Sequence, residues 1–134
     1  MLHLVSQSWT CEYVLSAIGT GKIDAAYQTD NGLFGFEWET SNISSSHRAI
    51  NKMALALYKK VMVAGVLVLP TRNMYQYLTD RIGKFPELQP YFPLWRSLNA
   101  TIKEGLLEII AIEQDETRLD IPRITKGTDG RALA

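Results

Sequence analysis

The sequence predicts an α/β domain in which a central β-sheet is flanked by helices. The strongest observation is VMVAGVLVL, residues 61–69, an apolar run that Pro70 stops. A continuous run rich in β-branched residues is typical of a strand that is buried on both faces. A second observation is TDNG, residues 29–32, because Asn-Gly pairs favour two-residue hairpin turns. At 134 residues the chain has room for one domain, over residues 1–134.

The other elements follow from hydrophobic spacing and from the signals that start and stop helices and turns. In chain order we expect a helix over about 8–18, a hairpin over 22–40, a helix over about 44–60, the buried strand 61–69, a helix over about 73–81, a proline-punctuated stretch to Pro93, a strand over about 105–112 and an irregular tail.

Composition limits the classes of protein. The longest apolar run has nine residues, whereas a transmembrane helix needs about 20. The first residues lack the basic and long apolar regions of a secretory signal, so a cytoplasmic location is expected. The single cysteine, Cys11, permits neither an internal disulfide nor a thiolate metal cage.

Charge is unevenly distributed although the formal net charge is zero. Residues 1–47 hold five acids and one base, residues 48–103 hold nine bases and two acids, and residues 104–134 hold seven acids and four bases. A basic centre can meet a polyanion locally, whereas overall neutrality argues against indiscriminate binding of nucleic acid.

Three carboxylates converge on the predicted hairpin. With Asn31 and Gly32 at the tip, Asp24 lies opposite Glu39, and alternation along the second strand puts Glu37 on the same face. A register shifted by one residue would place Asp24 opposite Glu37 and would keep the three acids together.

Such a cluster has three interpretations. Like charges at this spacing are relieved by a divalent cation or by a raised pKa on one acid, and oxygen-only ligands favour Mg²⁺ over zinc. The acids could instead form a solvated polar face of a half-exposed hairpin. They could also serve as a metal-free acid and base, as in glycoside hydrolysis.

A run of small polar residues follows Glu39 and opens the next predicted helix. Helix N-termini favour an anion, and the serines at 44–46 allow a phosphate or a base edge to approach closely. Arg48 lies one turn further along, near Ser44. Acids beside such a helix start suggest phosphodiester chemistry. The alternative is that Ser44 is only an N-cap and Arg48 only a solvated base.

The segment LTDRIGKF contains a second candidate, Asp80 followed by Arg81. The two side chains could form a local salt bridge. They could also read base edges in DNA, because arginine pairs with guanine and aspartate accepts from cytosine.

Two longer motifs resemble one known family. GFEWETSNISSSHRAINK, residues 35–52, and QYLTDRIGKFPELQPYF, residues 76–92, are similar almost position by position to the BamHI family of type II restriction endonucleases. GKID and ITKGTDG also look like that family, so the resemblance extends over about 9–130. It implies a compact PD-(D/E)xK nuclease fold with a mixed central sheet. In this variant glutamate, here Glu39, replaces the usual lysine of the motif.

The resemblance also implies roles for the acids. Asp24 would bridge two Mg²⁺ ions, Glu37 would be the second ligand, and the backbone carbonyl of Trp38 would complete that shell. Glu39 stands where the family has its candidate general base. Glu12 resembles the remaining acidic ligand, because WTCE repeats the family's Trp-x-x-Glu spacing on the preceding predicted helix.

For DNA recognition, the resemblance implies that Asn42, Ser44 and Arg48 contact bases and that Asp80 and Arg81 are directed at outer G·C pairs. The expected activity is therefore that of a type II site-specific deoxyribonuclease. Its expected substrate is double-stranded DNA with a palindromic site such as 5′-GGATCC.

A palindrome read by two symmetric subunits makes a homodimer the expected assembly, through the helices over 44–60 and 73–81. Members of the family are longer than this chain. Two alternatives stay open: a shortened or degenerate relative that binds DNA without efficient cleavage, and a metal-free carboxylate hydrolase.

Overall fold

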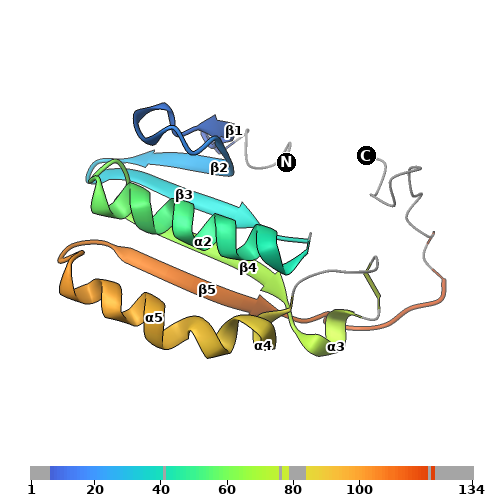
Figure 1. Ribbon diagram of the computed structural model, residues 1–134. Coiled ribbons are helices and arrows are strands. Elements are labelled where there is room, and N and C mark those ends of the chain that lie inside the picture. Colours follow the sequence, from blue (N-terminus) through green and yellow to red (C-terminus); the bar gives the residue numbers. More distant parts are fainter. Residues whose placement is uncertain (1–6, 41, 76, 79–83, 121, 123–134) are drawn as a thin grey trace.

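A computed structural model of the chain describes residues 7–40, 42–75, 77–78, 84–120 and 122. Its centre is one mixed sheet whose strands follow chain order (Figure 1): β1 (Thr10–Val14), β2 (Lys22–Thr29), β3 (Gly32–Trp38), β4 (Ala64–Pro70) and β5 (Leu106–Ile112). The first three strands are antiparallel neighbours, whereas β3, β4 and β5 run parallel. This mixed sheet with packed helices confirms the predicted α/β class.

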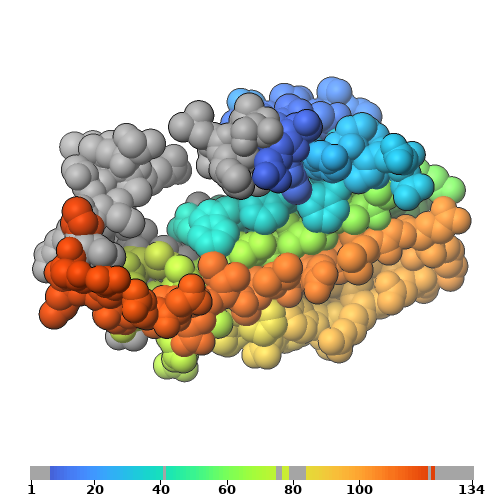
Figure 2. Space-filling model, turned by 180° about the vertical axis from the view of Figure 1, so that it is seen from behind, coloured from blue at the N-terminus to red at the C-terminus, as the bar shows by residue number. Residues whose placement is uncertain are grey.

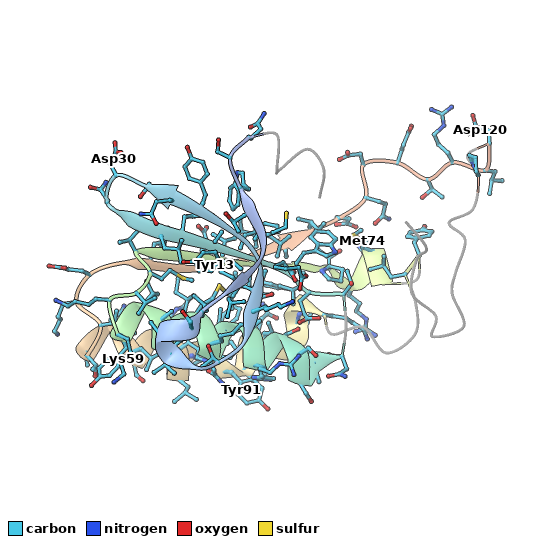
Figure 3. All side chains as sticks on the ribbon, turned by 90° about the horizontal axis from the view of Figure 1, so that it is seen from above. Tyr13, Asp30, Lys59, Met74, Tyr91 and Asp120 are labelled. Carbon is cyan, nitrogen blue, oxygen red and sulfur yellow. The ribbon has the colours of Figure 1, made fainter. Side chains whose placement is uncertain are left out.

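The parallel pairs require crossover connections, and helices provide them. The helical elements are η1 (Ser16–Ile18), α2 (Ile43–Tyr58), α3 (Arg72–Tyr75), α4 (Phe85–Leu88), η2 (Gln89–Tyr91), α5 (Phe92–Ser97) and η3 (Leu98–Ala100). Helix α2 connects β3 to β4, and the segment from α3 to η3 connects β4 to β5. Figures 1 and 3 place α2 and the α4–α5 segment on the same side of the sheet, with Tyr91 labelled on that side.

The hydrophobic core lies between this helical layer and the sheet. Helix α2 buries Ala49, Ile50 and Met53, a spacing that keeps one stripe toward the strands. On the sheet side, Leu67 and Leu69 of β4 are fully buried. The whole buried cluster comprises Leu15, Ile23, Ala26, Leu33, Ala49, Ile50, Met53, Ala56, Leu57, Met62, Leu67, Leu69 and Leu88.

The opposite face of the sheet is formed by side chains of the strands, and no described helix packs on it (Figure 2). The Trp9 ring lies 5.6 Å from the rings of both Tyr27 and Phe34. Val66 and Val68 of β4 are still only 7% exposed on this face. The prediction that this strand is buried on both faces is therefore confirmed.

The hairpin is confirmed, but its predicted tip is wrong. Thr29 pairs with Gly32, so the two turn residues are Asp30 and Asn31 rather than Asn31 and Gly32. The positive φ of +133° falls on Gly32, where a side chain is absent. The hydroxyl of Thr29 donates to the carbonyl of Gly32 at 2.6 Å and accepts from the N–H of Asn31 at 3.2 Å. These contacts fix the register of the hairpin, in which Ala25 pairs with Phe36 next to Asp24 and Glu37.

The expected helix over 8–18 is wrong. Residues 10–14 form the edge strand β1, and only 16–18 are helical. Their exposure alternates residue by residue, as in a strand with one face against the protein. The backbone of β1 forms its hydrogen bonds with β2, whereas a helix would have formed them within the segment.

The remaining elements agree with expectation to different degrees. Helix α2 and strands β4 and β5 match the predicted 44–60, 61–69 and 105–112 within three residues at each end. The helix expected over 73–81 is described only as the four-residue α3, and Tyr77 and Leu78 lie in a turn and a bend. The proline-punctuated stretch, for which no element was predicted, is helical from Phe85, and its prolines occupy first-turn positions of α4, η2 and α5.

No helix within the described ranges is long and apolar enough to cross a membrane.

Candidate active site

Asp24 and Glu37 face each other where β2 and β3 meet the start of α2. Ala25 pairs with Phe36, so Asp24 and Glu37 are the residues next to this pair on the two strands. The backbone N–H of Trp38 donates to Oδ2 of Asp24 at 2.7 Å. In return, the backbone N–H of Asp24 donates to the Glu37 carboxylate. Each acid is thus held by the backbone of the opposite strand, so both side chains have a fixed position.

Glu37 is a buried acid, only 7% exposed. Burial removes water from its carboxylate and raises its pKa above the ordinary value. A hydrogen bond and the charge of Lys52 oppose this shift, whereas the nearby negative charge of Asp24 adds to it. Desolvation is the largest effect, so the pKa of Glu37 is raised overall.

Lys52 completes the site, and sequence reasoning missed it. Its ammonium contacts Oε1 of Glu37 and donates to the backbone carbonyl of Lys22. The Lys52 side chain is only 10% exposed. A signal was present in the sequence, because position 52 lies among the buried positions Ala49, Met53 and Ala56 of α2. A lysine on the sheet-facing side of a helix needs a buried partner.

Glu12 lies in strand β1 and not on the predicted helix. The pairs Cys11–Ala25 and Tyr13–Ile23 flank it, so its backbone lies opposite Asp24. Its φ of +53° is unusual for a residue with a side chain and locally distorts the strand. The Glu12 side chain is largely exposed and meets the ammonium of Lys22 at 3.6 Å.

Glu39 lies one residue beyond the end of β3 and is half-buried. Its backbone N–H donates to the carbonyl of Val68 at 2.9 Å, which extends the pairing with β4. Across the described ranges, no group of three or more His, Cys, Asp or Glu side chains is arranged to hold a metal ion. Of the three acids expected to converge, Asp24 and Glu37 form a pair. Glu39 lies two residues after Glu37 in the chain, and Glu12 lies on the neighbouring strand β1.

The start of α2 follows these acids directly. Asn42 is the N-cap, and its Oδ1 accepts the N–H of Ser45 at 3.2 Å, so the alternative that Ser44 caps the helix is wrong. Ser44 and Arg48 are exposed and lie four residues apart, on one side of the helix. Asp80 and Arg81 lie outside the described residues.

His47 contacts the rings of Tyr91 and Trp95, with ring centroids 4.4 and 5.5 Å away. The indole N–H of Trp95 donates to Oδ1 of Asn51 at 3.1 Å. His47 therefore helps to pack α2 against α5 and lies on a different side of the helix from Lys52.

Comparison with known proteins identifies the family. A family model described as restriction endonuclease BamHI matches residues 1–131. The chain belongs to the BamHI family of restriction endonucleases. The resemblance found in the two sequence motifs is thereby confirmed, and the mixed sheet with its helices agrees with a restriction-endonuclease-like fold.

Two relatives within this group are type II restriction enzymes. OkrAI of Oceanobacter kriegii is 46% identical over 136 residues, which cover 99% of this chain and 69% of that enzyme. BamHI of Bacillus amyloliquefaciens is 38% identical over 97 residues, which cover 72% of this chain and 42% of that enzyme. The chain thus spans about two thirds of OkrAI, and its match to BamHI covers less than half of that enzyme.

Restriction endonucleases of this kind typically use a divalent metal, and the donor atoms at the site suit one. Asp24, Glu37 and the carbonyl of Trp38 offer only oxygen, which hard cations prefer. Mg²⁺ is commonly bound by one or two carboxylates, with water and phosphate completing the shell. Asp24 and Glu37 supply two such carboxylates. A cation also already contacts Glu37, because the Lys52 ammonium lies against it.

Proposed function

We propose that this chain is a Mg²⁺-dependent type II restriction endonuclease that cleaves double-stranded DNA at a palindromic site, with 5′-GGATCC as the expected sequence. The observation that carries the proposal is the Asp24–Glu37 pair, in which Glu37 is buried, Asp24 is half-buried and both are held by backbone hydrogen bonds. Membership of the BamHI family and similarity to two type II restriction enzymes support the reaction class.

In this proposal Asp24, Glu37 and the carbonyl of Trp38 hold the cations, and Glu12 supplies a further carboxylate from β1. Bound Mg²⁺ would lower the pKa of the attacking water and stabilise the leaving oxygen. Glu39, which is half-buried one residue beyond the end of β3, is assigned as the general base on the resemblance to the family. Hydrogen bonds between β2 and β3 preorganise the acids, so little rearrangement precedes the reaction.

Recognition is assigned to residues close to the acids in the chain. Asn42, Ser44 and Arg48 are exposed at the first turns of α2, where side chains can reach base edges in the major groove. Asp80 and Arg81 are assigned to the outer G·C pairs on the resemblance alone. A backbone shift on correct base contact would be transmitted to Glu37 and Glu39 within about ten residues of chain, which would couple recognition to cleavage.

The proposed assembly is a homodimer through α2 and the segment 73–81. Two-fold symmetry of the protein would match the symmetry of a palindrome. Exposed apolar side chains on these segments support the assignment, since Leu55 and Tyr58 of α2 are 36% and 53% exposed. Tyr77 is also exposed, at 52%.

A cleavage assay tests the proposal. The full chain is incubated with Mg²⁺ and a plasmid that carries one GGATCC site, with a plasmid lacking the site as control. We expect one linear product from the first plasmid and none from the second, and excess chelator should abolish the reaction. A site-specific gel shift in Ca²⁺ without cleavage would favour a relative that only binds DNA. Loss of both cleavage and gel shift would contradict the DNA assignment.

A further inference from the structure

Lys52 contacts the acid pair, but neither the family resemblance nor the proposed function gives it a role. Lys52 reaches from the middle of α2 to the sheet, where its ammonium lies between Oε1 of Glu37 and the carbonyl of Lys22. The side chains of Lys52 and Glu37 are 10% and 9% exposed, so this contact is shielded from water. Lys22 lies two residues before Asp24 on β2.

The ammonium of Lys52 occupies a position that also suits a small cation, because oxygen atoms surround it. Both oxygens that meet the ammonium belong to the strands of the acid pair, and Glu37 is itself a candidate ligand. A buried carboxylate without a counter-ion is costly, so the ammonium stabilises Glu37 when nothing else neutralises it. The same ammonium repels a divalent ion at close range, because like charges interact strongly where water is excluded.

We propose that Lys52 is the resident counter-ion of the acid pair: its ammonium neutralises Glu37 in the cation-free protein, and a divalent cation that binds at Asp24 and Glu37 displaces it. Lys52 is thus a positioning residue that sets the affinity for the cation. This inference rests on the proposed metal-dependent function.

Cation binding without DNA tests the inference and keeps it separate from catalysis. The full-length wild type and the Lys52→Met variant are titrated with Mg²⁺, and the heat of binding is measured. Methionine keeps the length of the side chain and removes its charge. We expect Lys52→Met to bind Mg²⁺ about tenfold more tightly or better, because the competing charge is gone. Equal affinities, or weaker binding by the variant, would overturn the inference.

Thermal unfolding in chelator gives an independent measurement. Without a cation, Lys52→Met leaves Glu37 buried and unpaired, so its Tm should fall by on the order of 10 °C. Added Mg²⁺ should restore more of the Tm in this variant than it adds to the wild type. An unchanged Tm in chelator would show that Glu37 does not depend on Lys52 and would overturn the inference.

A second variant decides the question if Lys52→Met does not fold without a cation. Lys52→Arg keeps the charge, and its guanidinium can hold a carboxylate at two points. We expect it to bind Mg²⁺ more weakly than the wild type, and tighter binding would contradict the displacement. Lys103→Met is the matched control, since Lys103 is exposed just before β5, outside the acid pair and the proposed dimer segments. Its Mg²⁺ affinity should stay within about twofold of the wild type.

The titration also separates this inference from the proposed function. Binding of Mg²⁺ by the wild type and Lys52→Met with the same affinity would overturn the role of Lys52 and leave the metal-dependent function standing. Absence of Mg²⁺ binding in the wild type and both Lys52 variants, even with cognate DNA present, would overturn both.

Discussion

The acid pair and the start of α2, which follows Glu37 by a few residues, are built in opposite ways. Asp24 and Glu37 are fixed by backbone hydrogen bonds, and Glu37 is buried against Lys52. Ser44 and Arg48 are exposed on the helix surface a few residues later. The difference follows from what each region must contact. A centre that acts on a phosphate gains from preorganisation and exclusion of water, whereas a surface that reads bases must remain open to DNA.

Asp24→Asn should have the largest effect, and it should impair cleavage at the acid pair without impairing recognition by the start of α2. The amide oxygen can still accept the N–H of Trp38, so the strands should keep their register. The lost charge should reduce single-turnover cleavage by about 10²-fold or more. Binding to the site in Ca²⁺, measured by gel shift, should remain largely intact. Wild-type cleavage by this variant would refute the metal role of Asp24.

Arg48→Ala should affect only the second region. Its exposed side chain takes no part in the core, so the Tm should change little. Discrimination between the cognate site and a site with one altered base pair should fall by about 1–3 kcal/mol, measured from the ratio of dissociation constants. Arg96→Ala is the control, because Arg96 is exposed on α5, outside the proposed interface. Unchanged discrimination in Arg48→Ala would remove this residue from the recognition surface.

Asn42 tests the boundary between the two regions, because it caps α2 and is also assigned to base contact. Asn42→Ala should lower the free energy of unfolding by about 1 kcal/mol, since the N–H of Ser45 loses its side-chain acceptor. Asn42→Ser keeps a good cap, so it should retain most of the stability in urea unfolding. If Asn42 reads a base, the serine variant should still lose site discrimination. Normal discrimination in Asn42→Ser would leave capping as the role of Asn42.

The sequence predicted the two regions unequally. Alternation along β3 correctly separated Glu37 from Phe36 and Trp38, but it did not show that the Glu37 side is the buried one. Helical spacing correctly put Arg48 near Ser44 on α2. Lys52 was missed because local pattern does not show which distant strand a helix covers. Only the parallel packing of β3 beside β4, with α2 across them, brings residue 52 to residue 37.

Two errors have a physical explanation. The edge strand β1 was mistaken for a helix because TCEYV is too short to decide between the two periods, and pairing with β2 decides its conformation. The hairpin tip was displaced because the Asn-Gly signal did not account for the Thr29 hydroxyl, which bonds Gly32 and Asn31. The first error reflects pairing with a separate strand, whereas the second reflects a side-chain contact within the turn itself.

The smallest expected effect is a change in how stability depends on pH, and it tests the burial that distinguishes the acid pair. Burial raises the pKa of Glu37 in the folded protein above its unfolded value, so the folded state binds this proton more tightly. The stability from this group is therefore present below the unfolded pKa and is lost as pH rises through the folded pKa. In chelator, the wild type should lose stability relative to Glu37→Gln over that interval, measured by urea unfolding at several pH values. Glu104→Gln, at an exposed position, controls for the loss of one carboxylate. If the difference between wild type and Glu37→Gln stays constant or changes in the opposite sense, desolvation does not dominate the pKa of Glu37, and the hydrogen bond and charge of Lys52 outweigh it.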